Sequence, residues 1–259
     1  MEAKIRALLL DYSRRKTGAA PESVALRAAD PWDVHIAFRL PGSGPFEVRS
    51  IHEDDLETFR VFSSRLSAAS KTSFCPYPWE NEDRLIPALR TAISQAVGRV
   101  DVCYFMLHEA HPAGEFFLWK AGGNPDSRTH GLEIPELGVG FIDAYHGRGL
   151  GGFSVRFLTI VAEHLKADAI ELTTTVDNTS GFHTYLSAGY EYVGEIANPL
   201  EADVTAILGE QASAARWRVE RQMIHVLNQS RRADVLAYLA EKRASSRALA
   251  AKSGLVLGG

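Results

Sequence analysis

The chain has 259 residues, of which 46% are hydrophobic and 23% are charged, the balance of an ordinary globular protein with a sizeable core. The net charge of −4 gives no general attraction to nucleic acid or to an anionic membrane, so neither is expected as a partner. The apolar run at 7–10 is too short for a signal sequence or a membrane span. Two cysteines without cationic sequence neighbours, Cys75 and Cys103, predict inert thiols and a cytoplasmic protein.

The N-terminal segment, residues 1–45, is predicted to form a helix and two short strands. Apolar residues from Ile5 to Tyr12 recur at helical spacing, and the runs VALRAA and DVHIAFRL have β-character. The breaker cluster PGSGP at 41–45 separates this segment from the rest of the chain, so we treat it as an extension.

Strands and helices alternate after the breaker. In chain order we expect a strand FEVRSI, a helix HEDDLETFRVFSSRL, an aromatic loop at 70–81, a helix DRLIPALRTAISQAV, a hairpin of VCYFMLH and EFFLWKA, a strand at 136–142, an amphipathic helix from about 153, a strand at 169–176, a short helix SGFHTYLSA, and two last strands, YEYVGEI and RWRVERQMIHVL. An insertion near 197–215 separates these last two strands.

An alanine-rich helix from about 230 to 252 closes the chain, and its apolar stripe is narrow. The stripe contains Ala233, Leu236, Leu239 and Ala240. A narrow stripe suits a partner helix better than a deep core, although packing on the same chain would also explain it. We therefore expect a homodimer.

Residues 143–152, DAYHGRGLGG, carry glycines at 147, 149, 151 and 152. A strand, a glycine loop and a helix in succession present backbone N–H groups and a helix N-terminus to an anion. Arg148 adds a cation. We expect this segment to bind phosphate, the alternative being a glycine-rich turn without a ligand.

Two kinds of phosphate ligand fit the glycine spacing. Gly147, Gly149 and Gly152 satisfy the dinucleotide fingerprint G-x-G-x-x-G. That fingerprint requires its first glycine directly after the strand and further parallel βαβ units downstream, whereas residues 143–146 intervene here and the pattern downstream predicts an antiparallel pair. A Rossmann-type nucleotide-binding protein is therefore the weaker alternative.

The second fit starts at His146 and reads His-x-x-Gly-x-Gly, which resembles the (Gln/Arg)-x-x-Gly-x-Gly signature of the GNAT superfamily of acyl-coenzyme A dependent N-acyltransferases. The run NTSGFHTYLSAGY at 178–190 also resembles the family's Asn-x-x-(small)-x-x-x-Tyr-x-x-x-Gly-(aromatic) block. The resemblance covers roughly 46–228 and is specific mainly across 136–190. Histidine at position 146 departs from the usual arginine or glutamine, which puts a side-chain phosphate contact there in doubt.

The resemblance implies an α+β fold, in which helices flank a mixed, mostly antiparallel sheet. The sheet would splay between the strands 136–142 and 169–176. It also divides the chain into three parts: an N-terminal extension at 1–45, an acyltransferase domain at 46–228 with the insertion near 197–215, and a C-terminal helix and tail at 229–259.

The resemblance further implies acetyl-coenzyme A as co-substrate and no metal. The glycine loop would bind the pyrophosphate, and pantetheine would pair with the splayed strand. Asn178 would bond pantetheine or order a water, or else cap the short helix. The implied cofactor-binding residues are Phe141, Ile142, Gly147, Arg148, Gly149, Leu150, Gly151, Gly152 and Asn178.

Two catalytic residues follow from the same resemblance. Tyr185 matches the family tyrosine that donates a proton to the departing coenzyme A sulfur, or it packs in the core. Glu136 aligns with a carboxylate that serves as base in some members, or it is an exposed strand-edge acid. Glu109 and Glu133 are weaker candidates, and His108 could join a water relay.

The acceptor is expected to be a primary amine of a small molecule, such as an amino sugar, an amino acid or a polyamine. Tyr77 and Trp79, beside Glu80, Glu82 and Asp83, would suit a cationic amine, or they pack on the core. A protein lysine or N-terminus is the alternative acceptor. A coenzyme A binding or sensing module without turnover is the alternative from another class of protein.

Overall fold

The computed structural model describes residues 1–199 and 217–252. Most of the insertion predicted near 197–215, and the tail after 252, lie outside these residues. The elements are α1 (Glu2–Thr17), β1 (Ser23–Asp30), β2 (Asp33–Arg39), β3 (Pro45–Ser50), α2 (Leu56–Ser64), α3 (Ala68–Ser73), α4 (Glu82–Val97), β4 (Val102–His108), β5 (His111–Trp119), α5 (Pro125–Arg128), β6 (Glu136–Phe141), η1 (Asp143–Tyr145), α6 (Leu150–His164), β7 (Ala169–Thr175), α7 (Thr179–Ser187), β8 (Glu191–Pro199), β9 (Trp217–Val226), η2 (Gln229–Arg231) and α10 (Arg232–Lys252).

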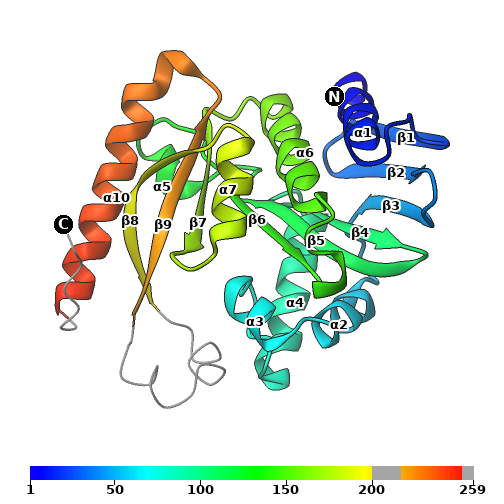
Figure 1. Cartoon of the computed structure of the whole chain (residues 1–259). Coiled ribbons are helices and arrows are strands. Elements are labelled where there is room, and N and C mark those ends of the chain that lie inside the picture. The colour runs from blue at the N-terminus through cyan, green and yellow to red at the C-terminus, as the bar shows by residue number, and fades with distance from the viewer. Residues whose placement is uncertain (200–216, 253–259) are drawn as a thin grey trace.

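The described strands form one nine-stranded sheet in the order β1-β2-β3-β4-β5-β6-β7-β9-β8 (Figure 1). Every neighbouring pair is antiparallel except β6 and β7. These two strands are parallel and pair at a single position, Glu136 with Glu171, beyond which they separate. The α+β class, the mostly antiparallel sheet and the splay predicted from the sequence are therefore confirmed.

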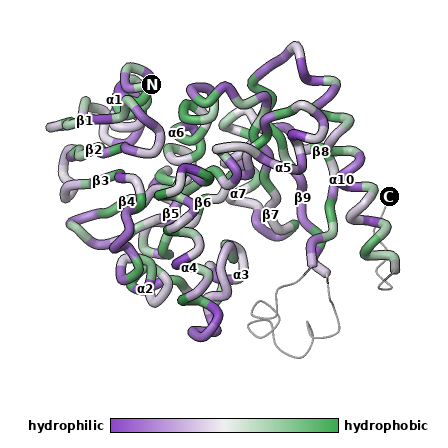
Figure 2. Tube along the Cα trace, turned by 180° about the vertical axis from the view of Figure 1, so that it is seen from behind, coloured by the Kyte–Doolittle hydropathy of each residue, from purple (hydrophilic) through white to green (hydrophobic). Residues whose placement is uncertain are grey.

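The two faces of the sheet carry different helices. α6 packs on the face of Phe116, where its Phe157 ring lies 5.7 Å from the Phe116 ring. α6 is hydrophobic along most of its length, as Figure 2 shows, because it is held between the sheet and α1. The chain between α2 and α4 covers the opposite face, where Tyr77 bonds Glu115. Residues that alternate along β5 thus belong to two separate layers.

The N-terminal segment is built into the same core. β1 and β2 extend the sheet beyond β3, and α1 lies against α6. The ring centroid of Tyr12 on α1 is 5.3 Å from that of Phe153 on α6. The extension predicted for 1–45 therefore shares the hydrophobic core of the rest of the chain.

The C-terminal helix α10 lies beside β8 and β9 (Figure 1). Its apolar residues Val235, Tyr238 and Leu239 pack on Ala169 and Ile224 of the sheet. Of the stripe predicted from the sequence, only Leu239 is buried there; Leu236 is half-buried, and Ala233 and Ala240 are exposed. The oligomeric state stays a prediction. Within the described residues, neither α10 nor any other helix is long and apolar enough to cross a membrane.

A buried acid under the α2–α4 layer makes stability depend on pH. Glu115 on β5 is fully buried and accepts a hydrogen bond from the Tyr77 hydroxyl at 2.8 Å. Burial raises the pKa of Glu115 to about 8, although the Tyr77 hydrogen bond works in the other direction. The folded chain therefore keeps a proton on Glu115 that the unfolded chain loses near pH 4.5.

We expect Glu115→Gln to flatten the pH dependence of folding stability. In the wild type, stabilisation from this group is complete below about pH 4.5 and is lost as pH rises toward 8, by up to about 1.4 kcal/mol per pH unit. A neutral glutamine removes this loss, so the variant should exceed the wild type in stability at pH 8 but not at pH 5. Urea unfolding at both pH values measures the difference, with the exposed Glu57→Gln as control. Parallel profiles for wild type and Glu115→Gln would contradict the assignment.

Candidate active site

The glycine segment forms the loop between β6 and α6. Gly147 and Gly149 adopt left-handed conformations, with φ of 71° and 77°, which side chains rarely tolerate. α6 begins at Leu150, earlier than the position near 153 predicted from the sequence, so Gly151 and Gly152 lie in its first turn. A Cβ atom on Gly151 would meet nothing within 4 Å. The space over this turn is therefore open.

The N-terminus of α6 has no side-chain cap. Gly149 is its N-cap residue, and the first intrahelical bond is donated by the Phe153 N–H to the Gly149 carbonyl at 3.1 Å. The N–H groups of Leu150, Gly151 and Gly152 therefore have no carbonyl partner in the helix. Such N–H groups, together with the helix dipole, favour an anion at this end of α6.

Two cations flank the loop. The end of Lys16 on α1 lies over Gly149, since a Cβ there would come within 2.6 Å of Lys16 Cε. The Tyr12 hydroxyl holds α1 in place by donating to the Arg148 carbonyl at 3.2 Å. The Arg148 guanidinium itself lies 5.0 Å from the centre of the Tyr145 ring.

His146, the departure from the family signature, has a structural partner. Its Nε2 lies 2.8 Å from the Phe141 carbonyl oxygen, to which it donates in the tautomer with that nitrogen protonated. The side chain therefore ties the loop back to the end of β6 rather than pointing into the space over the first turn of α6.

The open edge of β6 is defined by its pairing with β5. The Ile142 N–H donates to the Ala113 carbonyl at 3.0 Å, so this group faces β5. Because peptide groups alternate along a strand, the N–H groups of Val139 and Phe141 point the other way, into the gap beside β7. The Ile142 carbonyl accepts from the Tyr145 N–H at 2.9 Å, so both backbone groups of Ile142 have partners in the protein. Val139, which the sequence analysis missed, has its N–H on the open side together with Phe141; pairing of β6 with pantetheine stays a prediction.

Asn178 is the N-cap residue of α7. Its Oδ1 accepts from the Gly181 N–H at 2.9 Å, and its Nδ2 donates to Thr174 Oγ1 at 3.0 Å. The structure thus shows the capping alternative for Asn178, and a contact with the cofactor stays a prediction.

Tyr185 lies on α7, half-buried, on the same face of the sheet as the glycine loop. Its ring centroid is 6.0 Å from that of Tyr190. Burial raises the pKa of Tyr185 to about 12, so the hydroxyl keeps its proton at neutral pH. No residue of the described chain is hydrogen-bonded to that hydroxyl. Tyr185 therefore has a proton available for donation.

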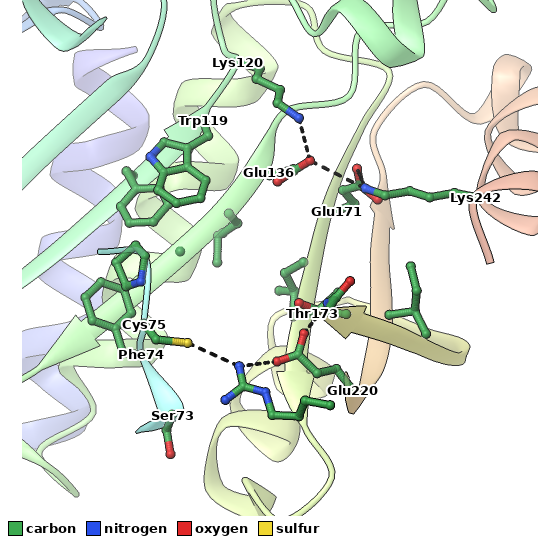
Figure 3. Close-up of a pocket in the computed structure, with 18 of the residues that line it drawn as sticks. Ser73, Phe74, Cys75, Trp119, Lys120, Glu136, Glu171, Thr173, Glu220 and Lys242 are labelled. Atoms are coloured by element: carbon green, nitrogen blue, oxygen red, sulfur yellow. Dashed lines mark hydrogen bonds and ion pairs between the residues drawn. The ribbon is translucent and has the colours of Figure 1, made fainter. Parts of the chain in front are cut away.

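A cavity of about 480 Å³ lies between the splayed strands and the helices of the opposite face (Figure 3). One wall is aromatic, and the facing wall carries charged side chains. The aromatic wall contains Phe74, Phe117 and Trp119, and the charged residues are Lys120, Asp126, Glu136, Glu171, Arg218, Glu220 and Lys242. Side chains from β5, β6, β7, β9 and α10 thus meet in one cavity.

Glu136 is part of an ion-pair network in this cavity and not an exposed edge acid. Its Oε1 is 3.0 Å from Lys120 Nζ and 3.5 Å from Lys242 Nζ, and its side chain is 29% exposed. Burial opposes ionisation, but Lys242 and Lys120 outweigh it and hold the pKa of Glu136 below its usual range. Glu136 is therefore a carboxylate, and its Oε2 has no partner within 1–199 and 217–252.

Glu171 lies next to Glu136 across the strand pair and is almost fully buried. It accepts from Lys242 Nζ at 2.7 Å and from Gln222 Nε2 at 3.4 Å. Burial raises the pKa of Glu171, the neighbouring Glu136 adds to this, and Lys242 opposes both. Both oxygens of this carboxyl are used inside the protein.

Arg218 organises the other end of the cavity. It donates to the Thr72 carbonyl at 2.7 Å and to Cys75 Sγ at 3.3 Å, and it pairs with Glu220. Cys75 has no cationic neighbour in the sequence, but Arg218 reaches it from a distant part of the chain; an inert thiol stays a prediction. No group of three or more potential ligands in the described residues is arranged to hold a metal ion.

The structure shows the core-packing alternative for Tyr77 and Trp79, not the acceptor wall. Both side chains are buried; the Tyr77 hydroxyl bonds Glu115, and Trp79 Nε1 donates to the Phe74 carbonyl at 2.7 Å. Glu80 pairs with Lys71 instead of facing the cavity. The weaker base candidates Glu109 and Glu133, and His108, do not line the cavity either.

No model of a known protein family matches the sequence, and no curated protein sequence matches it. Solved structures do match. The chain is similar to a ribosomal-protein-S5-alanine acetyltransferase from Vibrio fischeri, at 13% identity and a TM-score of 0.53 over 70% of this chain and 92% of that one. It is also similar to RimL, a ribosomal L7/L12 alpha-N-protein acetyltransferase in complex with coenzyme A, at 11% identity and a TM-score of 0.55 over 71% and 94%.

A third similar structure is the spermidine N-acetyltransferase from Vibrio cholerae in complex with coenzyme A and spermine, at 12% identity and a TM-score of 0.51 over 70% of this chain and 95% of that one. Another is an acetyltransferase of the GNAT family from Streptococcus pneumoniae, at 16% identity and a TM-score of 0.51 over 70% and 99%. The GNAT resemblance is thus confirmed at the level of the fold: the chain has the GNAT acetyltransferase fold.

Proposed function

We propose that this protein transfers an acetyl group from acetyl-coenzyme A to a primary amine of a small molecule. The observation that carries the proposal is the uncapped, glycine-lined start of α6 directly beside the gap between β6 and β7. Coenzyme A complexes among the structures of the same fold support this ligand.

The cofactor would extend from the glycine loop into the gap. Its pyrophosphate would accept from the N–H groups of 150–152, with Lys16 and Arg148 as nearby cations. Pantetheine amides would pair with Val139 and Phe141 as an added strand does. A Val139 or Phe141 N–H would then lie close to the thioester carbonyl and stabilise the tetrahedral oxyanion.

The reaction would proceed by direct attack in a complex of both substrates. The amine nitrogen forms a bond to the acetyl carbon, the carbon–sulfur bond breaks, and the leaving thiolate takes a proton from Tyr185. The attacking nitrogen loses a proton as the amide forms, and that proton restores the Tyr185 hydroxyl through water. An alkyl ammonium that titrates near 10 costs about 4 kcal/mol to deprotonate at pH 7. Glu136, held ionised by two lysines, is a weak base; it would bind the ammonium and pass its proton to water.

A small acceptor is favoured over a protein acceptor by the cavity. Its volume of about 480 Å³ suits a small molecule, and its described walls come from the strands on both sides of the gap between β6 and β7 and from α10. A protein lysine or N-terminus is the alternative acceptor; a ribosomal-protein-S5-alanine acetyltransferase and a ribosomal L7/L12 alpha-N-protein acetyltransferase have the same fold. Binding of acetyl-coenzyme A without turnover of any amine would instead indicate a binding module.

Acetyl-coenzyme A is expected to raise the melting temperature, whereas NADH is not. A ligand at about 100 times its dissociation constant adds about 2.7 kcal/mol, which should shift the melting temperature by about 5 °C or more. Differential scanning fluorimetry with each compound in turn measures this. Stabilisation by NADH alone would contradict the proposal and favour the Rossmann-type alternative.

A further inference from the structure

We propose that the acceptor is a monoamine with an apolar body and that Lys242, on the C-terminal helix, determines this specificity. Lys242 binds Glu171, so that one carboxylate oxygen in the cavity, Oε2 of Glu136, is left to bind an acceptor ammonium. This inference rests on the proposed function for the identity of the site as the acceptor pocket. It narrows the acceptor and excludes polyamines.

The first observation concerns Glu136 and Glu171, the one position at which β6 and β7 pair. Parallel register partners point to the same face of a sheet, so Glu136 and Glu171 lie side by side in the cavity. Lys242 Nζ lies between them, 2.7 Å from Glu171 and 3.5 Å from Glu136 (Figure 3). Two neighbouring carboxylates repel each other, and α10 supplies the ammonium that holds them together.

The second observation is which oxygen remains free. Glu171 uses both oxygens, for Lys242 and Gln222. Glu136 uses only Oε1, which faces Lys120 and Lys242. Oε2 of Glu136 therefore offers a binding position for one acceptor ammonium, with no competing partner in the described part of the chain.

The third observation is the charge of the cavity. Its described lining carries four carboxyl groups and three cations. Lys120 is shared between Glu136 at 3.0 Å and Asp126 at 3.5 Å, Lys242 is shared between Glu171 and Glu136, and Arg218 pairs with Glu220. The described lining thus has one more carboxyl group than it has cations, and Glu136 is the carboxylate with an oxygen left to bind an ammonium. A second ammonium in the same cavity would lie near a lysine or the arginine without a free anion.

The wall facing these charges is apolar. The Phe117 and Trp119 rings stack with centroids 4.5 Å apart, and Phe74 lies 6.1 Å from Phe117. Gly138 and Gly140 on β6 permit this, because a Cβ there would come within 2.1 Å and 2.3 Å of the Phe117 and Phe74 rings. An alkyl or aromatic body would pack here while its ammonium reaches Glu136.

Pentylamine and 1,5-diaminopentane test the inference, because they share a carbon chain and differ in the second ammonium. Calorimetric titration of the full-length protein measures the binding of each amine, with and without coenzyme A. The wild type should bind pentylamine at least about tenfold more tightly than the diamine. Lys242→Met removes a cation that would repel a second ammonium, so the preference should fall about tenfold, while Lys242→Arg should keep it.

Arg232→Met is the matched control, since it removes an exposed ion pair with Glu191 from the same helix far from the cavity. It should leave the preference unchanged. Lys120→Met should act like Lys242→Met and serves if the latter does not fold. An unchanged preference in both folded lysine variants, or failure of the wild type to bind pentylamine, would overturn the inference. Absence of acetyl transfer to an amine that binds would instead count against the proposed function.

Discussion

Substitution of Gly151 by valine is expected to weaken acetyl-coenzyme A binding by about 100-fold, or about 2.7 kcal/mol, while the protein remains folded. Gly151 lies in the first turn of α6, and a Cβ there would meet no protein atom within 4 Å. The valine side chain would therefore enter the open space assigned to the pyrophosphate without disturbing the core. Isothermal titration calorimetry measures the affinity, and circular dichroism confirms folding.

Gly151→Ala provides the graded control. Alanine is better than glycine in a helix by about 1 kcal/mol, so the melting temperature should rise while the affinity falls less than with valine. Gly149→Val is a poorer test, because Gly149 has a φ of 77° and its added Cβ would strike Lys16. Wild-type affinity in a folded Gly151→Val variant would place the phosphate elsewhere.

Tyr185→Phe is expected to lower kcat by about 100-fold and to leave acetyl-coenzyme A affinity unchanged. The ring that packs beside Tyr190 is kept, and only the protonated hydroxyl is lost. In the variant, coenzyme A must leave as an unprotonated thiolate, so the tetrahedral intermediate breaks down more slowly. Single-turnover kinetics isolate this step from product release.

Tyr190→Phe is the matched control for Tyr185→Phe. Tyr190 is 2% exposed, and its ring packs beside that of Tyr185. Because it is buried away from any substrate, its hydroxyl should be dispensable for turnover. If Tyr185→Phe reacts as fast as the wild type with chemistry rate-limiting, the acid is another group.

Local sequence patterns were sufficient to predict the core of the fold. The strand 102–108 was predicted as one arm of a hairpin, the short helix after Asn178 was predicted from its residue pattern, and the glycine segment located the start of α6 to within one turn. The splay after Glu136 followed from the family resemblance. Except for the splay, each of these features depends on residues close together in the sequence.

The candidate pocket could not be predicted in the same way, because distant residues build it. Lys242 reaches Glu171 across 71 positions, and Arg218 reaches Cys75 across 143. Tyr77 and Trp79 suited an acceptor wall and a core equally well by composition, and only the bond to Glu115 decides. Successive peptide groups of a strand point to opposite sides, so the N–H of Ile142 faces β5, whereas those of Val139 and Phe141 face the gap. The sequence alone does not show which of the two sets is free.

Transfer of a labelled acetyl group tests the central claim most directly. The protein is incubated with deuterated acetyl-coenzyme A and a set of small primary amines, followed by mass spectrometry of the amines and of the protein itself. We predict a deuterated N-acetyl monoamine that forms with the wild type and is strongly reduced with Gly151→Val and Tyr185→Phe. Binding of acetyl-coenzyme A without labelled product, or product that forms equally with both variants, would contradict the assignment of this site as an N-acetyltransferase centre.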